Sequence, residues 1–300
     1  MKFLFVMDPP ERLDRDGDTT LAFIDEATRR GHEALTCQPG DLWADGGRAM
    51  ARSGADVPLD GLDAVFLRKD PPYDVAYHLH TLLCELARGG TVFVNDPRGL
   101  RECHEKLFTL RFADLMPPTL VTADMGRLRA FLREQGGEMI LKPLEGAGGA
   151  GVLHVREADR NAGALIELLT DHGRRWAMAQ RYVPEARAGD KRIVLLDGRP
   201  IGAVLRVPRG DETRANLHVG GRAERTELTA RDREICARVG PALSALGLVF
   251  VGLDVLGPWL TEINVTSPTG IRQIDALDGV RLEADVIDWV ERRVGERPQR

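Results

Sequence analysis

Apolar residues occur in short runs along the N-terminal part of the chain, and stretches with helical spacing separate these runs. Alternation of this kind is typical of an open parallel α/β sheet. Ligands of such sheets lie beyond the carboxyl ends of the strands. The predicted strands are residues 2–7, 33–37, 64–67 and 91–94, and the predicted helices are residues 19–30, 74–88 and 99–112.

The segment Met116-Pro-Pro118 interrupts this alternation and predicts a domain boundary. A smaller α/β unit follows it, and the last part of the chain is rich in predicted strands. In the smaller unit we predict strands at residues 120–122, 138–141, 152–155 and 176–182, with helices at residues 126–135 and 162–172.

A hairpin with acidic residues on one face is predicted near the C-terminus. Asp254 lies in an apolar run, Gly257-Pro258 breaks the chain, and a second run follows. Folding about this turn brings Asp254 opposite Glu262, and strand alternation puts Glu262 and Asn264 on the same face. Close carboxylates repel each other unless a cation lies between them, and Mg²⁺ prefers oxygen ligands. The hairpin therefore indicates a metal site, although a solvated strand face would have the same pattern.

A glycine-rich loop follows the apolar strand that ends at Lys142. Four glycines occur within residues 146–151. They let backbone N–H groups approach a phosphate, and the lysine adds positive charge. The P-loop spacing G-x-x-x-x-G-K-[ST] is absent. By itself, this pattern fits a plain tight loop at least as well as a phosphate site.

Several other charged residues have both a functional and a structural interpretation. Asp8 and Arg68 follow predicted strands, where they either hold a substrate or form turns. Lys106, on a predicted helix, fits an ordinary surface position. Arg192 and Arg206 carry guanidinium forks that suit carboxylates or phosphates, and surface ion pairs are the alternative.

The segment 208–222 contains three glycines, three arginines and few apolar anchors. Loops of this length inside a compact domain are often active-site lids. We find no Ser/His/Asp or Cys/His arrangement that indicates a nucleophile, and the seven histidines lack metal-ligand spacing. The predicted chemistry is therefore positioning and charge neutralisation around phosphates.

Composition narrows the class of protein. A chain of 300 residues with 43% hydrophobic residues has ample length for a core. The net charge of −5 gives no support for nucleic-acid binding. The four scattered cysteines favour reduced thiols in the cytoplasm over a disulfide frame or a zinc site. No apolar run approaches the ~18 residues of a membrane span, and the apolar start is too short for a signal peptide.

The order of motifs along the whole chain resembles that of the bacterial-type glutathione synthetases of the ATP-grasp superfamily. It runs from E-K-L-F at 105–108, through L-K-P and the glycine loop, M-A-Q, D-K-R, G-G-R and G-L-D, to T-E-I-N-V-T-S-P. The most distinctive pieces are Arg68-Lys-Asp-Pro-Pro72, Asp190-Lys-Arg192 and Leu260-Thr-Glu-Ile-Asn-Val-Thr-Ser-Pro268.

This resemblance implies an architecture and a set of site residues. The implied fold is α/β, with a Rossmann-like N-terminal (pre-ATP-grasp) domain at 1–117 and a two-lobed α+β ATP-grasp fold at 118–184 and 185–300. The loop 208–222 would be its lid, and ATP would lie between the two lobes. By position, the nucleotide would contact Lys106, Lys142, Gly148, Gly149, Gln180, Tyr182, Val183 and Asp190. The implied metal ligands for Mg²⁺, or Mn²⁺, are Asp254, Glu262 and Asn264. The basic residues expected near the reacting groups are Arg192, Arg206 and Arg214, and the substrate would contact Arg68, Asn264, Ser267, Pro268 and Thr269.

The implied reaction joins γ-glutamylcysteine and glycine through an acyl phosphate, at the cost of ATP. Three positions depart from the usual motifs: Glu145 replaces Asp, Ala147 replaces Met, and Gly17 replaces a lysine. The alternatives are another ATP-grasp carboxylate–amine ligase and a non-catalytic ATP-binding regulatory module. We expect small-molecule substrates, a cytoplasmic location, and a homo-oligomer that is a dimer or tetramer.

Overall fold

The computed structural model describes residues 1–146, 148–208 and 221–297. Its N-terminal part is built on a four-stranded parallel sheet in the order β2-β1-β6-β7. All strands of this sheet were predicted. Three helices pack around it, and aspartate side chains cap the first turns of all three. These elements are β1 (Lys2–Met7), α1 (Thr19–Arg29), β2 (Glu33–Cys37), β6 (Ala64–Arg68), α2 (Val75–Glu85), β7 (Val92–Val94) and α3 (Pro97–Glu102).

Two features of this part differ from the prediction. A small antiparallel sheet of β3 (Leu42–Asp45), β4 (Arg48–Ser53) and β5 (Ala55–Pro58) was not predicted. The helix predicted at 99–112 is wrong, because α3 ends at Glu102 and a separate 3-10 helix, η4 (Phe108–Leu115), follows. Between them the His104 ring accepts hydrogen bonds from the backbone N–H groups of residues 106 and 107, at 3.3 Å each. In a continuous helix these two N–H groups would instead donate to backbone carbonyls one turn earlier.

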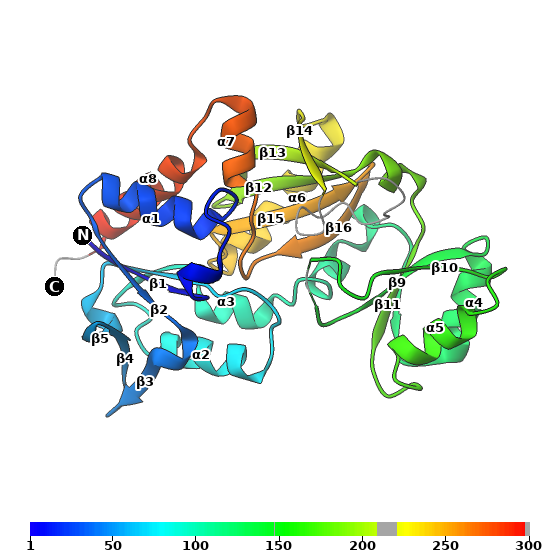
Figure 1. The fold of residues 1–300 in the computed structure, drawn as a ribbon, viewed down its shortest axis with the longest axis horizontal. Helices are drawn as coiled ribbons and strands as arrows, with labels where there is room; N and C mark the ends of the chain where they lie inside the picture. Colours follow the sequence, from blue (N-terminus) through cyan, green and yellow to red (C-terminus); the bar gives the residue numbers. More distant parts are fainter. Residues whose placement is uncertain (147, 209–220, 298–300) are drawn as a thin grey trace.

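The middle part contains an antiparallel sheet in the order β10-β9-β11-β8. Figure 1 shows β9, β10 and β11 of this sheet on the right. Two helices cover one face of this sheet and enclose a separate apolar core. The elements are β8 (Thr119–Thr122), α4 (Met125–Glu134), β9 (Glu138–Pro143), β10 (Leu153–Arg156), α5 (Ala162–Leu169) and β11 (Ala177–Arg181). Each confirms an element predicted there, with ends that differ by up to three residues.

The C-terminal part contains a five-stranded antiparallel sheet in the order β14-β13-β12-β15-β16. Its last two strands form the predicted hairpin, and Asp254 pairs with Glu262 as expected. The elements are β12 (Asp190–Leu196), β13 (Arg199–Val207), β14 (Arg222–Arg225), α6 (Ala230–Ala245), β15 (Phe250–Leu256), β16 (Trp259–Asn264), α7 (Ile271–Asp278) and α8 (Leu282–Gly295). The short 3-10 helices η1 (Pro10–Arg12), η2 (Pro39–Asp41), η3 (Leu59–Gly61) and η5 (Pro184–Ala188) complete the described elements.

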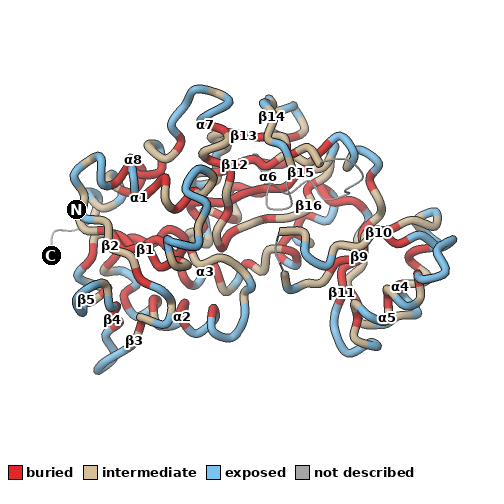
Figure 2. The backbone as a smooth tube through the Cα atoms, in the orientation of Figure 1, coloured by how far each residue is buried: buried red, intermediate tan, exposed pale blue. Residues whose placement is uncertain are grey.

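The N-terminal and C-terminal sheets share a core. One apolar cluster joins Phe5 and Phe66 of the parallel sheet to Phe250 of β15, and Figure 2 shows buried residues along the strands of both sheets. The buried Asn95 side chain spans the junction. Its amide nitrogen donates to the carbonyls of Phe250 and Val265, at 2.8 and 2.7 Å, and its oxygen accepts from the Phe250 N–H. The two sheets therefore form one packed body.

All four cysteines are free and buried. Burial raises the pKa of the Cys37 thiol to about 12 and that of Cys236 to about 11. It raises the pKa of the other two thiols as well. Across the described residues, no helix is long and apolar enough to cross a membrane.

Candidate active site

Two adjoining cavities lie where the three parts of the chain meet. The first, which we call the arginine cavity, has a volume of about 270 Å³ and includes Arg192 and Arg206 in its wall. The second, the lysine cavity, has a volume of about 160 Å³ and includes Lys106 and Lys142. Gly148, Asp254 and Glu262 line both cavities.

The shared wall comes from the β15–β16 hairpin. Pairing places Asp254 beside Glu262, and a bulge at Thr261 in β16 shifts the register after this pair. Glu262 and Asn264 are two residues apart on β16, so both face the arginine cavity, while Ile263 points into the core. Gly257 makes the turn with a φ of +56°, a conformation that favours glycine.

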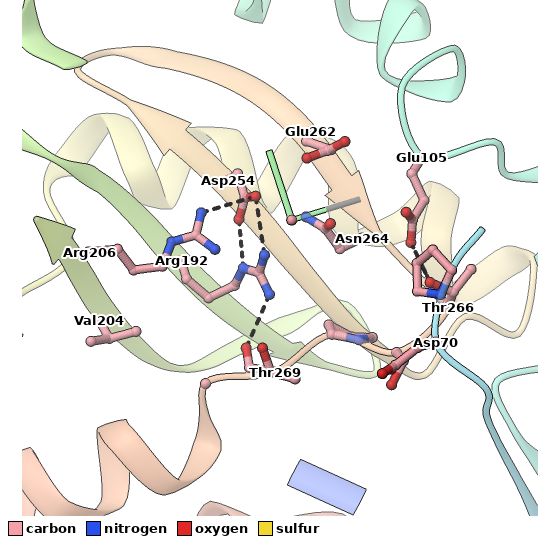
Figure 3. A pocket seen from close by; sticks show the side chains of 15 residues that line it. Asp70, Glu105, Arg192, Val204, Arg206, Asp254, Glu262, Asn264, Thr266 and Thr269 are labelled. Atoms are coloured by element: carbon pink, nitrogen blue, oxygen red, sulfur yellow. Dashed lines mark hydrogen bonds and ion pairs between the residues drawn. The ribbon is translucent and has the colours of Figure 1, made fainter. Parts of the chain in front are cut away.

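Two arginines from neighbouring strands hold Asp254. The Arg192 guanidinium donates to both carboxylate oxygens, from Nε at 2.6 Å and from Nη2 at 3.1 Å. The Nη2 atom of Arg206 lies 3.1 Å from Oδ2 of Asp254. Figure 3 shows both guanidinium groups beside this carboxylate. Burial by itself would raise the pKa of Asp254, but the two guanidinium groups outweigh it and lower the pKa. Asp254 therefore stays ionised although it is buried.

The same arginines connect Asp254 to both cavities. Arg206 donates from Nε to Asp190 Oδ1 at 2.8 Å, and Asp190 lines the lysine cavity. Burial raises the pKa of Asp190, against the attraction of Arg206. Arg192 donates from Nη1 to the carbonyl of Thr269 at 3.1 Å, in the loop that lines the arginine cavity. This network fixes the shared wall from both sides.

The two predicted lysines meet in the lysine cavity. Lys106 Nζ lies 2.9 Å from Glu262 Oε1 and donates to the Gly146 carbonyl at 2.9 Å. Lys142 is also buried, and burial lowers its pKa to about 8, with Lys106 adding to the effect and Glu262 opposing it. Both ammonium groups line this cavity, where they would stabilise a bound anion.

The remaining wall of the lysine cavity contains the other predicted nucleotide contacts. Gly148 and Gly149 line the cavity and have φ values of +64° and +78°, a conformation that favours glycine. Gln180, Tyr182 and Val183 follow one another along the end of β11 and the connection after it. The Tyr182 ring stacks on that of His154, with centroids 4.1 Å apart and planes 13° apart. Apolar side chains nearby suit a flat ring system.

The predicted substrate residues divide into two groups. Ser267, Pro268 and Thr269 line the arginine cavity. Arg68 is absent from that wall and is 3% exposed. Its Nη2 donates to the Pro268 carbonyl at 2.9 Å, and its guanidinium lies over the Phe250 ring. The structure therefore places Arg68 behind the cavity wall, where it holds the backbone of the lining loop.

Sequence reasoning missed Glu105, which lines the arginine cavity together with Asp70 of the predicted substrate loop Arg68-Lys-Asp-Pro-Pro72. Glu105 Oε1 accepts from the N–H groups of Val265 and Thr266 and from the Thr266 hydroxyl, at 2.8, 3.0 and 2.9 Å. Burial, with Glu262 nearby, raises the pKa of Glu105. Its position next to Lys106 was the available signal. Arg214, Ala147 and most of the predicted lid lie outside the described residues.

The predicted metal ligands offer only oxygen donors. The Asn264 amide nitrogen donates to the Gly252 carbonyl at 3.3 Å, which leaves its oxygen free. A carboxylate has about four lone-pair sites, and the three arginine contacts to Asp254 leave room for a cation. Within the described residues no three His, Cys, Asp or Glu side chains form a metal cluster, so any cation here needs the amide and further oxygens from ligands or water. The donor set fits a hard divalent cation.

Comparison with known families gives a consistent result over the chain. The model of the prokaryotic glutathione synthetase N-terminal domain matches residues 1–55 and 51–101, and that of the prokaryotic glutathione synthetase ATP-grasp domain matches residues 105–279. The glutathione synthetase of Synechocystis sp. is 47% identical, with 98% of this chain and 100% of that protein covered. That of Escherichia coli (strain K12) is 43% identical, with 99% and 100% covered.

Solved structures agree on the fold. The D-cycloserine synthetase DcsG superposes with a TM-score of 0.69 at 18% identity, covering 97% of this chain and 99% of that one. The ATP-grasp ligase PsnB, complexed with precursor peptide PsnA2 and AMPPNP, gives 0.65 at 20% identity and 98% coverage of both. Together with the family models, these likenesses show that the chain belongs to the prokaryotic glutathione synthetase family and has its N-terminal domain followed by an ATP-grasp fold.

Proposed function

We propose that this chain is a glutathione synthetase that uses ATP to join γ-glutamylcysteine to glycine. The observation that carries the proposal is the pair of cavities with a common charged wall, in a chain of this family. One cavity has the lysines and apolar walls that suit a nucleotide, and the other has the arginines that suit a carboxylate. Gly148, Asp254 and Glu262 line both cavities, so a phosphoryl group passing from one to the other would pass beside them.

In the proposed reaction, the cysteinyl carboxylate oxygen attacks the γ-phosphorus of ATP and ADP leaves. The amine of glycine then attacks the carbonyl carbon of the acyl phosphate, phosphate leaves, and the amine loses a proton as the amide forms. Lys106 and Lys142 would stabilise the negative charge of the transferring phosphoryl group. This reaction requires no protein nucleophile.

The arginine cavity would hold the peptide and glycine. Arg192 and Arg206 would attract carboxylate and phosphoryl oxygens while they keep Asp254 ionised. Ser267, Pro268 and Thr269 would contact the peptide directly, and Arg68 would support Pro268 from behind. Arg214, in the predicted lid, completes the basic set of this proposal.

Asp254, Glu262 and Asn264 would hold a divalent cation, for which we propose Mg²⁺, with Mn²⁺ as a substitute. When bound, the cation would neutralise negative charge on the phosphates. The chain itself keeps the ligands in place, since Lys106 contacts Glu262 and the arginines contact Asp254.

We also propose the domain boundaries, the cellular location and the oligomeric state of the protein. The chain would divide into domains at 1–117, 118–184 and 185–300, with the lid at 208–222. It would act in the cytoplasm, in keeping with its free cysteines. It would form a homo-oligomer, a dimer or a tetramer.

The test is phosphate release from ATP and Mg²⁺ with γ-glutamylcysteine, with and without glycine. We expect release that depends on glycine, with glutathione as the product. Glu262→Gln should lower turnover by more than about 100-fold with an unchanged thermal midpoint. Glu234→Gln, at a carboxylate that is 52% exposed on α6, is the matched control and should be fully active.

Two outcomes would contradict the proposal. ATP binding without release under any of these conditions would indicate a non-catalytic module. Release with another carboxylate and amine, but not with this pair, would place the chain among other ligases of the same fold. Near-normal turnover of Glu262→Gln would contradict the metal assignment alone.

A further inference from the structure

His154 lies beside the wall of the lysine cavity and supports one residue of that wall. Its imidazole ring stacks on the ring of Tyr182, with centroids 4.1 Å apart and planes 13° apart. Tyr182 lines the cavity, whereas His154 is absent from the described residues of the wall. A ligand in this cavity would therefore meet Tyr182 directly and be affected by His154 through Tyr182.

Strand pairing places His154 on the face of the sheet that the cavity occupies. In β10, His154 stands opposite Ile140 of β9, and Ile140 stands opposite Gln180 of β11. Side chains of directly opposed residues lie on the same face of a sheet, and both Ile140 and Gln180 line the lysine cavity. His154 therefore continues this row of side chains onto the edge strand β10.

The imidazole ring of His154 is held in place. Its side chain is 12% exposed, and its Nε2 atom lies 3.1 Å from Oε2 of Glu138. Glu138 comes two residues before Ile140 in β9, so its side chain lies on the same face. Oε1 of Glu138 lies 3.5 Å from Nε of Arg156, which stands opposite it in β10. Tyr182 thus packs on a ring that a neighbouring carboxylate already orients.

The segment that begins at Tyr182 has backbone groups available to a ligand. Among the described residues, the N–H and C=O groups of Tyr182 and the N–H group of Val183 have no hydrogen-bond partner. The groups on either side are fixed: the Arg181 N–H donates to the Pro118 carbonyl at 2.9 Å, and the Ala186 N–H donates to the Val183 carbonyl at 3.0 Å. Val183 is buried and lines the cavity. Buried backbone groups normally have partners, and the edge of a nucleobase offers both donors and acceptors.

We propose that His154 is a positioning residue for the nucleotide: by stacking on Tyr182, it holds residues 182 and 183 in place at the cavity, where their backbone binds the base of ATP. Without this stacking, Tyr182 would lose its support at the edge of the sheet, and ATP binding would have to order the segment, which lowers affinity. The inference rests on the ATP binding proposed above and adds to it a residue that does not contact the nucleotide.

Calorimetric titration with ATP measures this effect without turnover. His154→Ala should raise the dissociation constant for ATP by roughly two- to tenfold, the range expected for one aromatic pair. His154→Phe keeps a ring under Tyr182 but loses the contact with Glu138, and it should bind ATP as the wild type does. His78→Ala is the matched control, because His78 is exposed on α2 and also packs against a tyrosine ring, that of Tyr73. It should leave the affinity unchanged.

The phosphate assay separates positioning from catalysis. His154→Ala should raise KM for ATP by the same factor and leave kcat unchanged, because the base takes no part in phosphoryl transfer. The thermal midpoint checks that each variant is folded. If His154→Ala does not fold, His154→Leu replaces it, since leucine fills the space without a ring.

Hydrogen exchange tests the proposed cause directly. In the free protein, the backbone amides of Tyr182 and Val183 should exchange faster in His154→Ala than in the wild type, and His154→Phe should restore the slower exchange. The remaining amides of β9 and β10 should change little, because their ladder hydrogen bonds are kept.

Each contrary result points to a different failure. Wild-type affinity for ATP in folded His154→Ala and His154→Leu would overturn the inference, and so would a His154→Phe variant as weak as His154→Ala. Equal exchange at residues 182 and 183 in all variants would also overturn it. A wild-type chain that does not bind ATP would instead contradict the proposed function, on which the inference depends.

Discussion

At the scale of single residues, Asp254 and Lys142 show how neighbours decide the charge of a buried group. Two guanidinium groups contact Asp254 and lower its pKa despite burial. Lys142 is near Glu262 but also near Lys106, and burial lowers its pKa to about 8. Asp254 is thus ionised throughout the physiological range, whereas Lys142 in the free protein titrates close to its upper end.

This difference predicts a pH dependence of ATP binding. Only protonated Lys142 attracts the phosphates, and the free protein loses that proton as the pH rises through about 8. The affinity for ATP should therefore fall above this pH, by up to about tenfold per pH unit. Calorimetric titration with ATP between neutral pH and pH above 9 measures it. Lys142→Arg keeps its charge and should bind ATP with a flatter profile; an identical decline in that variant would assign the titration to another group.

At the scale of one element, alternate residues along β16 and just after it face the core and the candidate active site. Ile263 and Val265 are fully buried, whereas Glu262 and Asn264 line the arginine cavity. Because successive side chains point to opposite faces, neighbours in the sequence serve the core and the site in turn.

Ile263→Ala should therefore lower mainly the stability of the protein, and Asn264→Ala mainly its turnover. The first removes core volume and should lower the free energy of unfolding by roughly 2–5 kcal/mol. The second loses one weak hydrogen bond to Gly252, worth about 1 kcal/mol, but should abolish most turnover. Denaturant titration and the phosphate assay measure both effects. Equal destabilisation by the two substitutions would mean that Asn264 is chiefly structural.

Elements also show where sequence reasoning reached its limit. Hydrophobic period and turn residues were enough for the four parallel strands and for the β15–β16 hairpin. The break after Glu102 depends on a side chain, His104, that replaces backbone partners, and no periodicity signals this. Strands β3 to β5 are short, and only three of their fourteen residues are buried, so their apolar pattern is weak.

At the scale of the whole molecule, the site depends on contacts between parts that are distant in sequence. The motifs predicted Lys106, Lys142 and Glu262 separately, and the fold brings them together. Glu105 was not predicted, because its place at the cavity follows from packing against Val265 and Thr266 rather than from a local pattern. A contact with Pro268 of the same loop explains why Arg68, predicted to contact substrate, lies behind the wall.

Asn95 is the clearest polar link between these parts, and it predicts a global effect. Asn95→Ala leaves the Phe250 N–H and two carbonyls without their partner in a buried junction. Unsatisfied buried groups cost about 1–3 kcal/mol, so the whole chain should unfold at lower denaturant concentration. Asn161→Ala, at an exposed position near α5, is the control and should change little. An unchanged midpoint for Asn95→Ala would mean that water replaces the lost bonds.

The burial of all four cysteines has a consequence for the redox chemistry of the protein. The proposed substrate and product are thiol peptides, and their oxidised forms are disulfides. Exchange with a disulfide needs an accessible thiolate, and here each thiol is buried with its pKa raised. The protein can therefore work in a pool of thiols and disulfides without its own thiols becoming part of that pool.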